Sequence, residues 1–348
     1  MPEFESVLSE RLAGEWGIRG PYSLDKLKGD ASYRSYYRVH AGGAGKTFVL
    51  MQWDPALTSK AEEIAKGAAP AEFPFLNIQR YLGRGGVRVP GVVSSSVKDG
   101  LILLEDLGDV TLETTLAGKG LHERRVMYEE AVRNLVAIQS LGERDRDPAC
   151  LAFQRVFDRD LYVWEFNHYV EYGIEARSGS KVPPADRALM DEWFERLSDE
   201  LDAIPKGFTH RDYQSRNLMA CGGAWCLIDF QDALLGPPQY DLVALLKDSY
   251  VDIGEDDARH LVSVFLAERE KAGLPIEDEA FWRGFKVQTI QRKLKDAGRF
   301  IFIDRVKKNA SFLPHVPSSF EYVRRYLSTM DDLKDLHEIL GRYTPELR

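Results

Sequence analysis

The sequence predicts an α+β fold in two lobes, with a small strand-rich lobe followed by a larger helical lobe. The chain has 348 residues, which is more than one compact hydrophobic core usually holds. Short apolar runs typical of strands dominate up to about residue 105, and apolar residues at helical spacing dominate beyond about residue 121. We therefore expect the lobes to comprise residues 1–105 and residues 106–348.

The strand-rich lobe is indicated by three runs of aliphatic, aromatic and β-branched residues, at positions 36–39, 47–51 and 101–104. The glycine-rich segment 41–45 separates the first two runs, as it would in a hairpin turn. We therefore expect a small sheet that contains this hairpin.

Helices of the second lobe are indicated by apolar residues that recur every three or four positions. One such stripe consists of Met127, Ala131, Leu135 and Ile138, and another consists of Leu189, Trp193, Leu197 and Leu201. The prolines in segment 182–186 are typical of a helix start, and Gly273 is typical of a helix end. We expect both stripes to pack in the core.

Composition favours a cytoplasmic enzyme with small-molecule partners. The formal net charge of −9 argues against general binding to nucleic acid or to an anionic membrane, since both require a positive field. Cys150, Cys221 and Cys226 provide neither a disulfide framework nor the ligand pairs of a zinc site. The amino terminus lacks the pattern of a signal peptide, and no run of about 18 apolar residues predicts a membrane span.

The most informative segment is 209–217, with the sequence Thr-His-Arg-Asp-Tyr-Gln-Ser-Arg-Asn, followed by Ile-Asp-Phe at 228–230. Asp212 could accept a proton from an attacking hydroxyl, while Asn217 and Asp229 could hold the Mg²⁺ that neutralises nucleotide phosphates. A predicted hairpin with its turn at 221–224 would bring Asn217 and Asp229 together. Each part alone is common in proteins, but their combination and order predict a small-molecule kinase.

A candidate cover for the nucleotide phosphates precedes the first predicted strand. Gly29, Asp30 and Ser32 belong to a segment of small residues whose backbone amides could approach a phosphate. Arg34 and Arg38 would lie on one face of the following strand and add positive charge. The alternative interpretation is a plain turn that leads into the strand.

A candidate adenine contact follows the last predicted strand of the first lobe. The Glu105 carbonyl and the Leu107 amide could bond the adenine edge, because they lie where the two lobes are expected to join. The alternative is an ordinary acidic turn at 106–109.

Taken together, these segments resemble the aminoglycoside phosphotransferase and choline kinase-like family, which has the protein-kinase-like fold. Within that family the sequence is most similar to bacterial anomeric kinases for N-acetylmuramate and N-acetylglucosamine, which act in peptidoglycan recycling. The resemblance extends over roughly residues 8 to 345 and rests on segments 29–38, 103–109, 210–217, 227–241 and 291–298.

The resemblance implies ATP-dependent transfer to the hydroxyl of a sugar, above all the anomeric hydroxyl of an amino sugar. Asp212 would be the base, and Asn217 and Asp229 would be the Mg²⁺ ligands. The resemblance also implies that His210 and Asp241 order the catalytic loop without taking part in the chemistry.

The sequence departs from the family pattern at Met51, where many relatives carry the lysine that pairs with nucleotide phosphates. Lys46, Arg34 and Arg38 are the nearest substitutes, and an arginine is favoured because it holds phosphate oxygens bidentately. The glutamate that partners this cation in relatives has three candidates, namely Glu62, Glu63 and Glu72.

The substrate contacts are less defined than the catalytic loop. Segment 164–172 offers Glu165 among aromatic residues at helical spacing, most of which we expect to be packing. Arg292, with Lys293 and Lys295, would suit an acidic sugar, although a solvated helix face explains these charges equally well. Arg216 could contact phosphate or substrate.

Three alternatives to an amino-sugar kinase remain open. They are an aminoglycoside antibiotic kinase, a choline or ethanolamine kinase with an aromatic cage, and a non-catalytic nucleotide-binding scaffold. The scaffold is disfavoured because Asp212, Asn217 and Asp229 are all present. The sequence does not specify which sugar is used or the oligomeric state.

Overall fold

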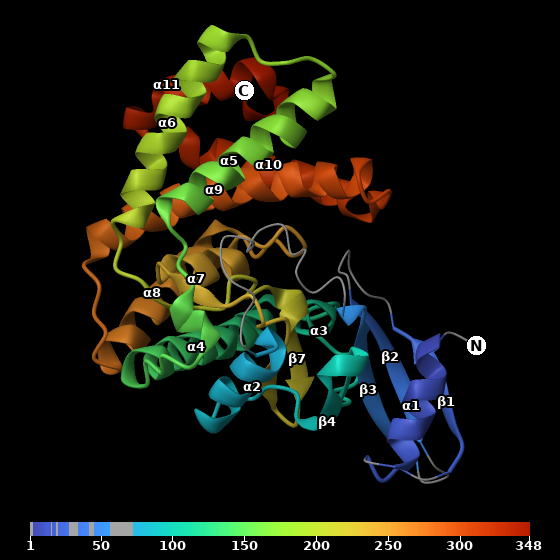
Figure 1. The fold of residues 1–348 in the computed structure, drawn as a ribbon. Helices are drawn as coiled ribbons and strands as arrows, with labels where there is room; N and C mark the ends of the chain where they lie inside the picture. The colour runs from blue at the N-terminus through green and yellow to red at the C-terminus, as the bar shows by residue number, and fades with distance from the viewer. Residues whose placement is uncertain (1–2, 15, 19, 28–33, 42–44, 56–71) are drawn as a thin grey trace. The chain divides into compact units, whose positions relative to one another are not determined.

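The computed structural model describes residues 3–14, 16–18, 20–27, 34–41, 45–55 and 72–348 (Figure 1). They form two structural units. The first contains residues 1–110 and 219–231, and the second contains residues 111–218 and 232–348. Residues 219–231 thus group with the first unit, whereas the boundary predicted from the sequence places them in the helical lobe.

The first unit contains a five-stranded antiparallel sheet with the strand order β1-β2-β3-β5-β4. Its strands are β1 (Tyr22–Lys26), β2 (Arg34–Ala41), β3 (Lys46–Trp53), β4 (Val92–Ser96) and β5 (Leu101–Glu105). The three predicted strands are confirmed as β2, β3 and β5, and the predicted hairpin is confirmed by the pairing of Ala41 with Lys46. The α+β organisation predicted from the sequence is also confirmed.

Helix α1 (Glu3–Ala13) packs on one face of this sheet, beside which it is seen in Figure 1. Leu8 and Leu12 of α1 share an apolar core with Leu50 and Leu103 of the central strands. Side chains alternate between the two faces of a strand, so the neighbouring Met51 points to the opposite face, where it is also fully buried.

The remaining elements of the first unit are α2 (Pro74–Arg84), the 3₁₀ turn η2 (Val97–Asp99) and a hairpin of β7 (Leu218–Cys221) and β8 (Ala224–Leu227). Gly222 and Gly223 form the hairpin turn with φ of 57° and 89°, which glycine adopts without strain. The hairpin predicted from the sequence is therefore confirmed. The ring of Phe230, just after β8, lies 4.8 Å from that of Phe75 in α2.

The second unit is mainly helical. Its longer helices are α4 (Leu121–Arg144), α5 (Arg159–His168), α6 (Pro184–Asp202), α7 (Gln239–Leu246), α8 (Glu255–Lys271), α9 (Asp278–Arg305), α10 (Val316–Leu327) and α11 (Lys334–Tyr343). Shorter elements are α3 (Leu112–Thr115), β6 (Gly207–Thr209), β9 (Leu234–Gly236), the π-helix η4 (Tyr169–Ala176) and the 3₁₀ turns η3 (Leu151–Gln154), η5 (Ser215–Asn217), η6 (Ala310–His315), η7 (Asp331–Leu333) and η8 (Pro345–Leu347).

The two predicted apolar stripes have different outcomes. The α4 stripe is confirmed, with Ala131, Leu135 and Ile138 buried. The α6 stripe is wrong at its start, because Leu189 is exposed and the buried face begins at Met190. Residues spaced strictly by four rotate steadily around a helix with 3.6 residues per turn, so such a series cannot remain on one face.

Helix α9 is the central element of the second unit and is buried on most of its surface. Helix α5 and its continuation η4 lie along it, as Figure 1 shows for α5. The Tyr162 hydroxyl donates to Gln288 at 3.1 Å, and Gln291 donates to Glu165 at 2.7 Å. Gly298 allows the closest approach, since a Cβ there would lie 2.8 Å from the Tyr169 Cα.

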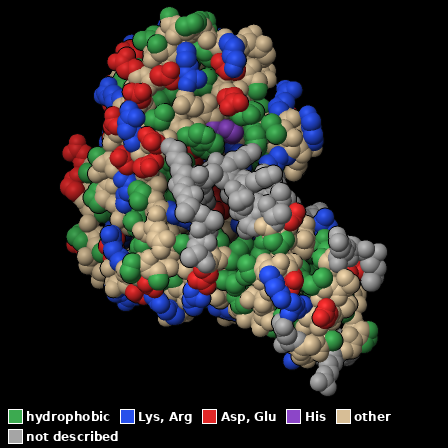
Figure 2. Space-filling view, in the orientation of Figure 1, with side chains coloured by type: hydrophobic (Ala, Val, Ile, Leu, Met, Phe, Trp, Pro, Cys, Tyr) green, Lys and Arg blue, Asp and Glu red, His purple; other side chains and the backbone are tan. Residues whose placement is uncertain are grey.

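Surface charges are mixed on the face drawn in Figure 2, where acidic and basic side chains of the described residues alternate. No helix within the described ranges has the length and apolar character needed to span a membrane.

Candidate active site

The loop that follows β6 is held by a buried carboxylate of α7. Asp241 accepts hydrogen bonds from the backbone amides of His210, at 2.7 Å, and Arg211, at 2.9 Å. Arg211 has a φ of 80°, in the left-handed region that non-glycine residues rarely adopt. These two buried hydrogen bonds thus stabilise a strained backbone conformation immediately before Asp212. Burial raises the pKa of Asp241 above its ordinary value.

Asp212 emerges from this strained turn with its side chain 37% exposed. Arg292 of α9 orients the Asp212 side chain through two contacts. One guanidinium nitrogen lies 3.2 Å from Asp212 Oδ1, and another donates to the Arg211 carbonyl at 2.8 Å. Burial raises the pKa of Asp212, but nearby positive charges, led by Arg292 and Lys295, outweigh burial and hold this pKa below its ordinary value. Asp212 is therefore an oriented, ionised carboxylate with access to solvent.

The end of the same loop orients Asn217. Its side-chain Nδ2 donates to the Asp212 carbonyl at 2.8 Å, which leaves the side-chain oxygen as the atom that could ligate a metal. Asp248 anchors this part of the loop by accepting from the Ser215 amide at 3.0 Å and the Ser215 hydroxyl at 2.6 Å. Asp212 and Asn217 are thus brought together by direct hydrogen bonding within one loop.

Asp229 follows β8 in the first unit and has a φ of 62°. Gln231 donates to its Oδ1 at 2.8 Å. Asn217 and Asp229 offer the amide and carboxylate oxygens that Mg²⁺ prefers, and Mg²⁺ commonly needs only one or two protein ligands besides phosphate oxygens and water. Within the described ranges no group of three or more His, Cys, Asp or Glu could hold a metal. That Asn217 and Asp229 share one Mg²⁺ stays a prediction.

The candidate phosphate cover falls largely outside the described residues, which include neither Gly29, Asp30 nor Ser32. Arg34 begins β2 opposite Trp53. Met51 is fully buried in β3. This strand position therefore holds an apolar side chain instead of the phosphate-binding lysine that the family pattern predicts.

Arg38 is already engaged and is a poor substitute for the missing lysine. Its guanidinium donates four hydrogen bonds of 2.7 to 3.1 Å to Asp106 and Asp109. Two carboxylates therefore neutralise this arginine within the first unit. Lys46 is exposed at the opposite end of β3 from Trp53, and Arg34 is half-buried at the start of β2. Which cation pairs with the nucleotide phosphates stays a prediction.

Of the candidate partner glutamates, Glu62 and Glu63 lie outside the described residues. Glu72 binds Arg80, at 2.6 and 2.8 Å, and Asn77, at 3.0 Å. These contacts tie Glu72 to α2.

The proposed adenine contacts lie at the end of β5. The Glu105 side chain accepts hydrogen bonds from Arg88 and from the Gly91 amide, the latter at 3.1 Å. Its carboxylate is therefore structural. Leu107 is half-buried, next to a turn in which the Gly108 amide donates to Asp106 at 3.0 Å. The adenine-binding roles of the Glu105 carbonyl and the Leu107 amide stay predictions.

Glu165 and Arg292 have side chains that are only 1% exposed, and their predicted contacts with substrate stay a prediction. Glu165 accepts from Gln291 at 2.7 Å and lies 3.6 Å from the Arg211 guanidinium. These residues hold the catalytic loop from α5 and α9. Sequence alone could not separate a buried ion network on a helix from a solvated charged face.

Arg216 is also occupied by neighbours within the second unit. It donates to Glu113 of α3 at 2.8 and 3.2 Å, and its guanidinium carbon lies 3.4 Å from the centre of the Tyr250 ring. Both contacts fix the loop between Asp212 and Asn217.

The aromatic residues of segment 164–172 are mainly packing, as expected. His168 lies against the rings of Trp164, Tyr172 and Phe302, with centroid distances of 4.8 to 5.4 Å. Trp164 alone of these rings is exposed, at 37%. This aromatic cluster therefore connects segment 164–172 to α9 through Phe302.

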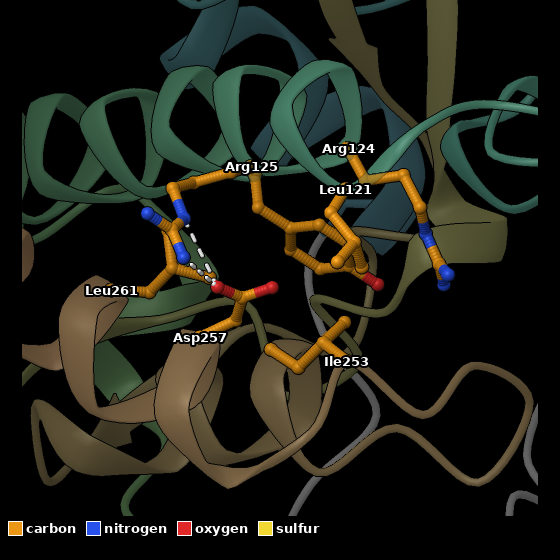
Figure 3. A pocket seen from close by; sticks show the side chains of 7 residues that line it. Leu121, Arg124, Arg125, Ile253, Asp257 and Leu261 are labelled. Atoms are coloured by element: carbon orange, nitrogen blue, oxygen red, sulfur yellow. Dashed lines mark hydrogen bonds and ion pairs between the residues drawn. The ribbon is translucent and has the colours of Figure 1, made fainter.

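The pocket in Figure 3 lies between α4 and α8 and is too small for a substrate. It is lined by Leu121, Arg124, Arg125, Tyr128, Ile253, Asp257 and Leu261, and its volume of about 10 Å³ suits one water molecule. Arg125 points across it to Asp257. A shallower hollow of about 460 Å³ is lined by α11 and the carboxyl terminus. Neither contains Asp212 or Asn217.

Sequence reasoning missed the anchoring roles of Asp248, Glu113 and Arg292. A usable signal was present in α9, which combines apolar residues on every face with closely spaced charges at 292, 293, 295 and 296. Charges of both signs within an otherwise buried helix indicate internal ion pairs.

Comparison with known proteins is consistent with this geometry. A family model described as "Phosphotransferase enzyme family" matches residues 23–285. The sequence is 30% identical over 322 residues to an N-acetylmuramate/N-acetylglucosamine kinase of Neisseria meningitidis serogroup B, covering 92% of this chain and 90% of that protein. It is 28% identical over 328 residues to the protein of the same name from Pseudomonas putida, covering 94% and 90%.

Solved structures with similar folds have much lower sequence identity. An ADP-bound aminoglycoside phosphotransferase aligns with a TM-score of 0.60 at 14% identity, covering 91% of this chain and 97% of that one. A choline/ethanolamine kinase family protein from Mesorhizobium loti also aligns with a TM-score of 0.60 at 14% identity, covering 99% and 98%.

Proposed function

Because the chain belongs to the phosphotransferase enzyme family, we propose that it is an ATP-dependent kinase that phosphorylates the anomeric hydroxyl of an amino sugar. N-acetylmuramate and N-acetylglucosamine are the proposed substrates, since they are named in relatives that align over nearly the whole chain. The observation that carries the proposal is Asp212, a partly exposed carboxylate oriented by Arg292 next to a strained peptide.

In the proposed reaction, Asp212 accepts the proton of the sugar hydroxyl as the oxygen attacks the γ-phosphorus of ATP. The new O–P bond forms while the bond to the ADP oxygen breaks. The anomeric hydroxyl is the most acidic hydroxyl of a sugar, which suits a carboxylate base whose pKa lies below its ordinary value. Asn217 and Asp229 would hold Mg²⁺, which when bound neutralises charge on the phosphates.

The test is ADP release with Mg-ATP and a panel of acceptors, using Asp212→Asn as the matched blank. Asparagine keeps the shape of the side chain but cannot accept the proton, so turnover should fall about 10²- to 10⁴-fold. The panel comprises N-acetylmuramate, N-acetylglucosamine, glucosamine, galactosamine, kanamycin and choline. Turnover of the N-acetylated sugars with an acid-labile phosphate product is expected.

Other outcomes of this assay separate the alternatives. Turnover confined to kanamycin or choline would retain the base and replace the substrate. Parental rates from folded Asp212→Asn protein would reject Asp212 as the base. An absence of ADP release with every acceptor would favour a nucleotide-binding scaffold.

A further inference from the structure

Three cations follow one another on α9, and they differ in exposure. Arg292 and Lys293 are each 1% exposed, whereas the Lys295 side chain is 16% exposed. Arg292 is used by Asp212 and the Arg211 carbonyl. Of these three side chains, Lys295 is therefore the most exposed.

Lys293 and Lys295 share one carboxylate unequally. Lys293 Nζ donates to the Ser249 hydroxyl at 2.6 Å and lies 2.8 Å from Asp296 Oδ2, in an ion pair rather than a directed hydrogen bond. Lys295 Nζ lies 3.2 Å from Asp296 Oδ1. An ammonium has three donors, and Asp296 is the only ion-pair partner of Lys295 among the residues that the structure describes. Lys295 therefore retains donors for a further anionic group.

Lys295 also lies one helical turn from Arg292, the residue that contacts the candidate base. It follows Arg292 by three positions, so the two side chains share one face of α9 with their Cβ atoms roughly 5 to 6 Å apart. Arg292 reaches Asp212 directly, and the charge of Lys295 acts on the same carboxylate. Burial lowers the pKa of Lys295, but Tyr240 and Asp296 outweigh burial and raise it above its ordinary value, so Lys295 is charged at neutral pH.

A second polar group at this place lacks a partner. The Tyr240 hydroxyl is fully buried and has no hydrogen bond to any residue that the structure describes. Its ring faces the Arg292 guanidinium at 4.9 Å, and its charged neighbours include Glu165 and Lys295. Buried hydroxyls usually have a hydrogen-bond partner, so this one is an unsatisfied polar group beside the cations of α9.

We propose that the Lys295 ammonium binds the carboxylate of an acidic amino sugar held next to Asp212. This inference rests on the proposed function and adds the residue that distinguishes N-acetylmuramate, which bears a lactyl carboxylate, from neutral N-acetylglucosamine. A carboxylate is favoured over the transferring phosphoryl group, because Asp212 receives the proton of the acceptor and its neighbours on α9 therefore line the acceptor side.

The test compares Lys295→Met with the parent in steady-state assays on both sugars. Loss of a charge-assisted hydrogen bond should raise the KM for N-acetylmuramate about 10- to 100-fold. The KM for N-acetylglucosamine should change less than about threefold, and kcat should be retained for both. The control is Lys286→Met, which removes the same charge from a half-buried position earlier on α9 and should alter neither constant.

A second measurement uses the unaltered protein, so that a folding defect cannot obscure the result. The analogue of N-acetylmuramate with a carboxamide in place of its carboxylate should show a KM raised to a similar extent. Circular dichroism and thermal melting establish whether Lys295→Met is folded.

Several results would overturn the inference. Equal losses on both sugars in Lys295→Met, whether in KM or in kcat, would place the lysine at the phosphoryl group or in the fold. An unchanged KM for the carboxamide analogue would show that no cation reads the carboxylate. If the parent protein phosphorylates N-acetylglucosamine but not N-acetylmuramate, the inference is rejected and the proposed kinase is retained. If it phosphorylates no sugar, both are rejected.

Discussion

Arg292 is a buried charge that holds the loop of the candidate base, and we expect it to act without contacting the reactants. Burial alone would lower its pKa, but neighbouring groups, led by Tyr240 and Asp296, raise it well above its ordinary value. Its two donated bonds, to the Arg211 carbonyl and to Asp212, require a planar fork of nitrogens. We therefore expect Arg292 to position Asp212. A lysine has the charge but no planar guanidinium, so it should not replace Arg292 in this role.

Arg292→Lys tests this interpretation. A lysine keeps the charge but cannot span both oxygens, so we expect kcat to fall about 10- to 100-fold while the KM for ATP changes little. Steady-state kinetics and urea unfolding measure the two effects separately. Arg305→Lys, at the exposed end of the same helix, is the matched control. Parental kcat in folded Arg292→Lys would contradict the positioning role.

At the scale of single elements, the sequence predicted the strands and helices whose residue pattern is typical of one environment, such as a fully buried strand. Strand β5 is a continuous apolar run and was predicted, whereas β4 contains three serines and was not. Polar strands pair through their backbones, which leave no trace in the side-chain pattern. The stripe of α6 was misplaced by one position at its start because spacing by four residues drifts around the helix.

Helix α9 was the element that sequence described least completely. Its charges at 292, 293 and 295 were predicted to suit a substrate or a solvated face, and two of the three are internal. A helix enclosed on most sides has no polar face by which periodicity could identify its orientation. Arg292 contacts the loop at 211–212 and the Tyr240 ring, and Lys293 contacts the Ser249 hydroxyl, all of them distant from α9 in sequence.

The packing of η4 on α9 leads to a prediction about two helical glycines. A methyl group at Gly298 would lie 2.8 Å from the Tyr169 Cα, whereas one at Gly341 of α11 would lie 3.6 Å from the Arg348 side chain. Gly298→Ala should therefore lower the free energy of unfolding by about 1 to 3 kcal/mol. Gly341→Ala should be neutral or raise it by up to about 1 kcal/mol, because alanine favours helix.

Urea unfolding monitored by circular dichroism measures both glycine variants. Because the two substitutions are chemically identical, the difference between them isolates the close contact of η4 with α9. Equal midpoints for Gly298→Ala and Gly341→Ala would show that this contact can relax without cost.

At the scale of the whole molecule, the motifs predicted the family and the order of the candidate catalytic residues. The family resemblance is confirmed by the match over residues 23–285. The chain alternates between its two units, because residues 219–231 return to the first unit after the catalytic loop. Asp229 is thus contributed by one unit and Asn217 by the other. The motifs and their spacing singled out both residues, and that the two hold one Mg²⁺ stays a prediction.

Ligand binding should test Asp229 as a magnesium ligand through a change in the stability of the whole protein. A nucleotide that binds only the folded chain stabilises it by about 2.7 kcal/mol at a hundredfold excess over Kd. If Asn217 and Asp229 hold Mg²⁺, the Tm increase should be larger with Mg-ATP than with ATP and a chelator.

Asp229→Asn should abolish most of that difference, since it replaces a charged ligand with a neutral one. Asp212→Asn should preserve the difference, because Asp212 is assigned to the proton and not to the metal. Thermal melts of the three proteins decide the matter, and an undiminished magnesium-dependent shift in folded Asp229→Asn would exclude Asp229 as a ligand.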